Sequence, residues 1–491
     1  MEESSFNMNE ETVMARSIQS SNDRERYRSE TILGRGRTLS TDIFETGINN
    51  NMLVIGPSGS GKTRNVLKPN LLQMGSSFIV LDTKGTLCRE VGPELVEHGY
   101  RVEYLDFANL SGDQDFLPEG ISRVGYDPLA FIRTTERDGR VVPNQQDIIS
   151  VARRLCPTEN HKDPFWDRAA SNLIACLIAY VMEELPPSEQ HFGSAIALAE
   201  HLDDRAAFKL LDDLETTDPG SLAYSLYQRY AGTLAAPQMS GSIAGVVAEK
   251  LMCLGFDGTL ALYTADQKVN FDGFDGPPCA LFVAVSDLDR SLDPLTSLFV
   301  DQAFTELVRK ADRNPGGMLK KPVRFMLDDF ANLNIENIDN ILSIVRSREI
   351  WCTLFVQSIN QLDAIYGHAR AQSIISNCDT QLVLAFQDAE TARCFNDRAD
   401  KLPTSLLQMS RKHAMLFIAG ARGEEVEKYR LEEHPLYQEC MKRAEQGARS
   451  AKLKGRVING VRGVEGLNAP IDPDLLELDM LDLRSERELP L

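Results

Sequence analysis

A glycine-rich loop at residues 56–63, with the sequence GPSGSGKT, constrains the fold of this 491-residue chain more than any other feature. It matches the pattern G-x-x-x-x-G-K-[ST], whose glycines let backbone N–H groups turn inward and cradle phosphate oxygens. The loop stands between a short apolar run, Met52–Ile55, and a segment compatible with a helix, 64–73. A helix that begins at the loop directs its positive end at bound phosphate. The sequence therefore predicts a strand, a phosphate-binding loop and a helix.

The loop is expected to bind ATP together with Mg²⁺. Lys62 should reach the β- and γ-phosphates, and the Thr63 hydroxyl should be a ligand of the Mg²⁺ ion. The predicted ATP-binding residues are Gly56, Pro57, Ser58, Gly59, Ser60, Gly61, Lys62 and Thr63.

A site of this kind also requires a carboxylate at the end of a strand, to hold Mg²⁺ through water. Two candidates follow apolar runs: Asp82 after residues 77–81, and Asp328 after Val323–Leu327. Asp82 is equally typical of an acid that only closes a turn. RecA-like motors place the metal-binding acid on a later strand adjacent to the loop strand, often followed by an acid that polarises the attacking water. This layout favours Asp328 as the metal-binding residue and Asp329 as the base.

Asp329 is an unusual base, because Glu is usual at the second position of such a pair. The Asp side chain is one methylene shorter, which sets its carboxylate back by roughly 1.5 Å. A displacement of that size can cost on the order of 100-fold in rate. Either the backbone compensates for the short side chain, or turnover is slow.

Three further side chains are candidates for the response to nucleotide. Gln357 follows a predicted strand, 353–356, and a glutamine there can sense the γ-phosphate; its alternative role is structural. Arg346 and Arg348 follow the helix after the two acids. In a ring, an arginine of one chain can reach the γ-phosphate held by its neighbour. The alternative is that both arginines belong to an ordinary surface.

The order of apolar and helical segments predicts an α/β fold with an insertion. Strand-length apolar runs alternate with helical segments up to residue 105, which indicates βαβ units and a mainly parallel sheet. Helical patterns then dominate until about Asp257, and strands return at 280–285. We expect a RecA-like nucleotide-binding domain formed by two segments, 49–130 and 258–435, with an inserted all-α domain at 131–257 between them. A polar extension, 1–48, precedes this domain, and a C-terminal helix with an acidic tail, 436–491, follows it.

Charge and apolar content restrict the environment of the chain. Its net charge of −20 disfavours coating of DNA but leaves binding through a narrow channel open. The nine cysteines are scattered without C-x-x-C spacing, which indicates a reducing cytosol and no zinc site. The longest apolar run, 173–182, falls short of the roughly 20 residues of a membrane span. We expect a cytoplasmic chain whose acidic tail from Pro470 either binds a partner or only increases solubility.

Several motifs together resemble the type IV coupling proteins, the TraG/TraD-like ATPases of conjugation and type IV secretion. The resemblance is strongest to the branch found on mobile elements of Gram-positive bacteria and extends from about residue 49 to residue 434. Besides the loop at 56–63, the matching segments are 78–85 (FIVLDTKG), 163–170 (DPFWDRAA), 323–333 (VRFMLDDFANL), 346–350 (RSREI), 357–362 (QSINQL) and 377–379 (NCD).

The resemblance implies a hexameric RecA-like ring with a helical domain at its cytoplasmic mouth. Family members receive a relaxase bound to single-stranded DNA and pass it to a secretion channel. Lys62 and Thr63 match the family's nucleotide site, Asp328 its metal-binding acid and Gln357 its sensor glutamine. Arg346 has the spacing of the family's trans-acting arginine and is preferred to Arg348 on that basis.

Three departures from the family pattern qualify these expectations. Thr83 stands where Pro is usual, and Asp329 replaces Glu. Most members begin with transmembrane helices, and none is predicted here. We expect the chain to lie at the inner face of the cell membrane through a separate membrane subunit; the alternative is a truncated or cytosolic form. Two other functions stay open: an intracellular DNA translocase of the FtsK or HerA class, and a weakly hydrolysing receptor that docks cargo in response to nucleotide.

Overall fold

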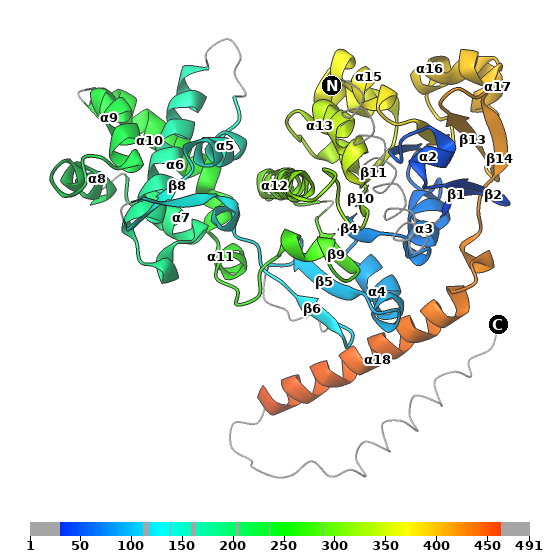
Figure 1. Cartoon of the computed structure of the whole chain (residues 1–491), viewed down its shortest axis with the longest axis horizontal. Helices are drawn as coiled ribbons and strands as arrows, with labels where there is room; N and C mark the ends of the chain where they lie inside the picture. The colour runs from blue at the N-terminus through cyan, green and yellow to red at the C-terminus, as the bar shows by residue number, and fades with distance from the viewer. Residues whose placement is uncertain are drawn as a thin grey trace, which may run out of the picture.

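The computed structural model describes residues 30–110, 117–137, 139–158, 164–202, 206–234, 236–286 and 288–462. Most of the predicted polar extension, Asp163 of the DPFWDRAA segment and the acidic tail lie outside these ranges. Figure 1 shows two lobes, one built on a large sheet and one made mainly of helices, with helix α12 (Asp293–Arg313) between them.

The sheet lobe is built on ten strands in the order β14-β13-β12-β3-β11-β10-β4-β9-β5-β6. Neighbouring strands from β12 to β6 are parallel, whereas β13 is antiparallel to both β12 and β14. The central strands read as continuous apolar runs because helices cover both of their faces. The strands are β3 Met52–Ile55, β4 Ser77–Asp82, β5 Arg101–Asp106, β6 Ile121–Arg123, β9 Cys279–Ala284, β10 Val323–Leu327, β11 Ile350–Val356, β12 Thr380–Val383, β13 His413–Ile418 and β14 Glu424–Glu427.

The strand order corrects one prediction. We expected the strand that ends at Asp328 to lie beside the loop strand, but β11 lies between β3 and β10 and pairs with both. Crossover connections decide which strands pair, and the local apolar pattern carries no information about them. One consequence is that Gln357, directly after β11, lies at the edge of the sheet between the loop and Asp328.

Helices cover both faces of this sheet. One face packs against α3 (Lys68–Leu72), α4 (Leu87–Glu97) and the start of α18 (Tyr437–Arg462), whose buried side chains form one apolar cluster with the strands. The other face packs against α12 and a group of shorter helices. That group comprises α13 Ile338–Val345, α14 Ile359–Tyr366, α15 His368–Ser376, α16 Ala389–Ala399 and α17 Pro403–Leu407.

The helical lobe forms around α6, Phe165–Glu184. This helix carries the apolar stretch LIACLIAYVM and is buried on most sides, as expected of a helix without a wide polar face. It contacts α5, α7, α9 and α10. The helices of this lobe are α5 Gln145–Leu155, α7 Phe192–Glu200, α8 Ala206–Thr217, α9 Leu222–Leu234, α10 Pro237–Leu251 and α11 Asp257–Tyr263.

Two hairpins were not predicted as such. The hairpin β7–β8 (Thr134–Arg137 and Arg140–Pro143) stands at the start of the helical lobe, so the region is not all-α as expected. Its first strand is fully exposed, which explains why it has no apolar alternation to read. The hairpin β1–β2 (Glu30–Gly34 and Arg37–Ser40) precedes α2, Ile43–Thr46, and all three elements lie within the segment 1–48 that was expected only to be a polar extension.

Among the described residues, no single helix has the length and apolar content needed to cross a membrane. One pair passes that test when its two members are taken together: Gln238–Gly255 and Asp257–Tyr263, which meet at an angle of 79°.

Candidate nucleotide-binding site

The loop between β3 and the next helix has the backbone that its glycines allow. Gly59 and Gly61 have φ angles of 76° and 100°, in the left-handed region that side chains with a Cβ rarely adopt. A Cβ on Gly61 would also lie 2.7 Å from Nδ2 of Asn65. Gly61 belongs to the sequence pattern and Gly59 does not, but the backbone conformation favours glycine at both positions.

The helix after the loop begins with a π-helical turn, Lys62–Leu67, before α3. The N–H of Lys68 donates to Thr63 O, five residues earlier, and the following residue is Pro69, which has no N–H to continue an α-helical ladder. The helix predicted over 64–73 is therefore one continuous helix from residue 62 to residue 72, π-helical up to Leu67 and α-helical from Lys68. Its amino end still faces the loop, as phosphate binding requires.

Lys62 is buried inside the loop. Its Nζ donates to Gly56 O at 2.8 Å, and within the described part of the chain it forms no ion pair. Burial lowers the pKa of the ammonium, while the nearby charges of Asp329 and Asp328 oppose this shift. An ammonium bonded to one carbonyl can exchange that bond for a phosphate oxygen.

Thr63 and Asp328 meet although 265 residues separate them in the sequence. Thr63 Oγ1 donates to Asp328 Oδ2 at 3.3 Å, and the N–H of Asp329 donates to Asp328 Oδ1 at 3.1 Å. Burial, and then the charge of Asp329, raises the pKa of Asp328 to about 6. The structure thus brings Lys62, Thr63, Asp328 and Asp329 together at the carboxyl ends of β3 and β10.

These residues fit a magnesium ion bound with nucleotide. The facing hydroxyl and carboxylate supply the oxygen ligands that Mg²⁺ prefers, and the ion usually completes its shell with water and phosphate. No group of three or more His, Cys, Asp or Glu side chains that could hold a metal occurs in the described ranges. A magnesium site completed by phosphate needs no such group.

The two remaining acids have distinct surroundings. Asp82 accepts hydrogen bonds from the N–H groups of Lys84 (3.2 Å) and Leu87 (2.6 Å), so its carboxylate closes the turn after β4. Asp329 has a φ of 48° and a ψ of 42°, a left-handed conformation in which Asp is enriched over most residues. The backbone at position 329 therefore favours Asp over the longer Glu.

The candidate sensor and arginines lie outside this cluster. Gln357 is exposed at the end of β11, and its N–H donates to Gln361 Oε1 at 3.0 Å. Arg348 is paired within its own chain, since its Nε lies 2.9 Å from Asp312 Oδ1. The Arg346 residue is exposed, and its side chain makes no hydrogen bond or ion pair with any residue that the structure describes. Arg346 is therefore available to a neighbouring molecule.

Sequence reasoning missed one residue at the loop. Lys428 directly follows β14, and its Nζ donates to Ser60 O at 3.0 Å. Strand β14 has the sequence EEVE with one buried side chain, so neither apolar alternation nor a motif marks this segment. A short edge strand of this kind can be recognised only from its pairing with β13.

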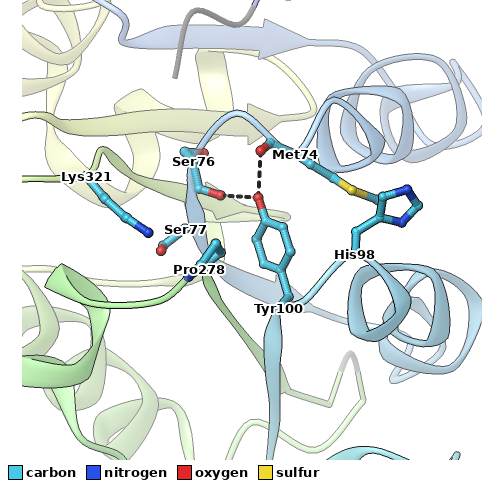
Figure 2. Close-up of a pocket in the computed structure, with 7 residues that line it drawn as sticks. All are labelled: Met74, Ser76, Ser77, His98, Tyr100, Pro278 and Lys321. Atoms are coloured by element: carbon cyan, nitrogen blue, oxygen red, sulfur yellow. Dashed lines mark hydrogen bonds between the residues drawn. The ribbon is translucent and has the colours of Figure 1, made fainter. Parts of the chain in front are cut away.

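A pocket of about 220 Å³ lies at the opposite edge of the sheet, where β4, β5, β9 and β10 begin. Figure 2 shows the Tyr100 hydroxyl, which lies 2.7 Å from Met74 O and 2.9 Å from Ser76 O, in this pocket. The candidate nucleotide site lies instead at the carboxyl ends of the strands, where parallel sheets usually bind ligands. The lining residues are Met74, Ser76, Ser77, His98, Tyr100, Pro278 and Lys321.

Comparisons with known proteins agree with the motifs. The model of the family described as type IV secretory system conjugative DNA transfer matches residues 1–415. Conjugal transfer protein TraG of Escherichia coli is 24% identical over 408 residues, which cover 75% of this chain and 60% of TraG. Protein VirD4 of Rhizobium radiobacter is 23% identical over 345 residues, which cover 69% of this chain and 46% of VirD4. The chain thus spans about half to three fifths of the length of these relatives.

Solved structures of a plasmid coupling protein share the fold. TrwB in complex with the ATP analogue ADPNP matches with a TM-score of 0.59 at 18% identity, covering 83% of this chain and 91% of TrwB. TrwB in complex with ADP and Mg²⁺ matches with a TM-score of 0.56 at 19% identity, covering 77% of this chain and 85% of TrwB. The predicted α/β class, a RecA-like domain with a mainly parallel sheet and an added helical region, is confirmed. The chain belongs to the type IV secretory system conjugative DNA transfer family.

Proposed function

We propose that this chain is an ATP-hydrolysing coupling protein that recruits a relaxase bound to single-stranded DNA and moves it to a type IV secretion channel. The observation that carries the proposal is the contact of Thr63 with Asp328 beside the buried Lys62, in a chain of this family. Solved structures of TrwB with ADPNP and with ADP and Mg²⁺ support nucleotide binding as the activity of this fold.

The proposed roles follow from the geometry. Backbone N–H groups of the loop and the Lys62 ammonium bind the phosphates, and Thr63 with Asp328 holds the magnesium ion. When bound, Mg²⁺ neutralises charge that develops on the phosphate oxygens. Asp329 accepts the proton of the attacking water, and Gln357 responds to the γ-phosphate from the strand between the two halves of the site.

The wider organisation belongs to the same proposal. The chain forms a homohexameric ring, in which Arg346 of one subunit reaches the nucleotide of the next. A separate membrane subunit holds the ring at the inner face of the cell membrane. The domains that we propose for the chain are those predicted from the sequence. They are the nucleotide-binding domain in two segments, 49–130 and 258–435, the helical insertion at 131–257, an extension at 1–48 and a C-terminal region at 436–491.

Stimulation by DNA tests the proposal. Purified full-length chain should hydrolyse ATP, and single-stranded DNA should increase the rate more than duplex DNA does. Affinity capture from the native host should recover a relaxase and components of a secretion channel. Recovery of only nucleases or recombinases, with stimulation by duplex DNA alone, would support a translocase of the FtsK or HerA class instead.

The short base at position 329 gives a prediction about the rate. Replacing Asp329 by Glu is expected to raise the turnover number by up to about 100-fold, because the longer side chain brings the carboxylate to the usual distance from the attacking water. The left-handed backbone at this position should make the variant less stable by about 1 kcal/mol.

Steady-state ATPase assays of wild type, Asp329→Glu and Asp329→Asn measure this effect. The Asn variant, which lacks the base, should be slower than both. Fast wild-type turnover that Glu does not increase would remove the basis for a weakly hydrolysing cargo receptor.

A mixing experiment tests the role of Arg346. Arg346→Ala and Lys62→Ala chains are each expected to be inactive, but an equal mixture should recover activity. In a random mixed ring, about one quarter of the interfaces join an intact nucleotide site with an intact arginine. No recovery from mixtures that form stable hexamers would show that Arg346 does not act on the neighbouring site.

A further inference from the structure

Lys428 is a buried cation that points at the phosphate loop from outside the motif. Only 9% of the residue is exposed, and its Nζ donates to Ser60 O at 3.0 Å. It forms no ion pair with any residue in the described ranges, and the charged neighbour that affects it is another cation, Arg411. Burial, and then the charge of Arg411, lowers the pKa of the Lys428 ammonium. Lys428 also lies beyond residue 415, where the match to the family model ends.

The sheet topology explains how this residue reaches the loop. Strand β13 reverses direction relative to β12, and β14 reverses again, so β14 runs parallel to β3. Both strands therefore end at the same edge of the sheet. The Lys428 N–H donates to Lys412 O at 2.9 Å, which extends the pairing of β14 by one residue toward the loop.

Two further contacts join the end of β14 and the segment after it to other elements near the phosphate loop. Glu432 forms an ion pair with Arg64, the residue that follows the loop. The N–H of Arg35 donates to Glu427 O at 2.8 Å, which joins the β1–β2 turn to the end of β14. Contacts before and after Lys428 therefore hold this part of the chain near the loop, and the ammonium itself bonds to Ser60 O.

The bond to Ser60 O determines the direction of the next N–H group. A peptide unit is planar and trans, so the Ser60 carbonyl and the Gly61 N–H point in opposite directions. With the carbonyl turned toward the Lys428 ammonium, the Gly61 N–H points away from that ammonium. No group in the described part of the chain accepts a hydrogen bond from this N–H. A cation on the carbonyl also polarises the peptide and strengthens the N–H as a donor.

We propose that Lys428 is a positioning residue for nucleotide: it fixes the Ser60–Gly61 peptide so that the Gly61 N–H faces the phosphates. The inference rests on the proposed nucleotide site and adds to it a residue from the C-terminal edge of the sheet. The φ angle of 100° at Gly61 permits this orientation, and Lys428 selects it from those that a glycine can adopt.

The test compares Lys428→Met with wild type in the full-length chain. Met keeps the length and the apolar stem but removes the donor. The Kd for the non-hydrolysable analogue ADPNP is expected to rise about tenfold, which corresponds to about 1.4 kcal/mol. Inorganic tripolyphosphate, used as a competitor, should lose affinity by the same factor because the N–H acts on phosphate. Lys428→Arg should recover some of the affinity, since guanidinium is also a donor.

Lys401→Met is the matched control. Lys401 pairs with Glu425 on the same strand β14, so this variant removes a lysine that contacts the same strand without removing a contact to the loop. Its Kd for ADPNP should equal that of wild type. The melting temperature without nucleotide should be similar for wild type and both Met variants.

The outcomes separate the two proposals. An unchanged Kd in Lys428→Met, with wild type binding ADPNP normally, would overturn the role of Lys428 alone. A lower melting temperature with unchanged affinity of the folded fraction would make Lys428 a structural contact, which also overturns it. Lost affinity for ADPNP but not for tripolyphosphate would place its effect on the base or sugar and would likewise contradict the proposal. A folded wild type that binds neither ligand would refute the nucleotide site itself.

Discussion

Replacing Lys62 by alanine is expected to lower the rate of ATP hydrolysis by about 10²- to 10³-fold, because it removes a preorganised cation from a site where negative charge develops. The ammonium lies inside the loop on Gly56 O, so nucleotide binding needs only a local exchange of partner. Nucleotide affinity should fall as well, since the cation also contacts phosphate in the ground state.

The same substitution should not unfold the protein. Burial lowers the pKa of Lys62, so keeping this group charged in the folded chain costs stability at neutral pH rather than supplying it. That cost is present below the folded pKa and disappears above the unfolded pKa. ATPase rates and melting temperatures should therefore be measured together, with exposed Lys320, just before β10 at the other edge of the sheet, replaced by Ala as the control. Retention of wild-type hydrolysis by a folded Lys62→Ala chain would refute the assigned site.

Replacing Asp328 by asparagine should lower the rate of hydrolysis by a similar factor and raise the stability of the folded chain. Loss of the carboxylate weakens the hold on Mg²⁺, so hydrolysis should fall by about 10²- to 10³-fold and require more Mg²⁺ for half-maximal rate. A magnesium titration of the residual activity measures this shift. Asn keeps an acceptor for the Asp329 N–H and a polar partner for the Thr63 hydroxyl.

The stability gain follows from the raised pKa of Asp328. The pKa of Asp328 is about 6 in the folded chain against 3.8 ordinarily. Ionised Asp328 therefore lowers the free energy of unfolding, and this effect grows between pH 3.8 and pH 6 and is complete above pH 6. The shift of about two units corresponds to about 2–3 kcal/mol, which Asp328→Asn should recover at pH 7.5. The gain should be about half as large at pH 5 and vanish below the unfolded pKa. Urea denaturation of both proteins at pH 7.5 and pH 5 tests this, and equal stability at pH 7.5 would contradict it.

Much of the site could be predicted because its residues stand at the ends of apolar strands. The bounds of β3 and β10 match those expected, since turn residues flank each clear pattern. Thr63 and Asp328 were expected to hold one Mg²⁺ ion, and their side chains are in contact at 3.3 Å. Local pattern was sufficient for both inferences.

Other features depended on contacts that no local pattern records. The place of β11 between β3 and β10 is set by crossover connections, and the exposed hairpin β7–β8 has no apolar face. Lys428 reaches the loop through two successive antiparallel pairings of short edge strands. The left-handed backbone of Asp329 suits the short side chain that the sequence marked only as a departure from Glu.

The position of β11 has a consequence for how subunits would assemble. This strand runs through the middle of the sheet, with Arg346–Arg348 just before its amino end and Gln357 just after its carboxyl end. Seven residues of strand separate these ends by about 23 Å. An arginine on one edge that reaches a neighbour's nucleotide on the other requires subunits to associate head to tail. Such an interface is directional, and it gives a closed ring two unlike faces and a single sense of rotation from each site to the next.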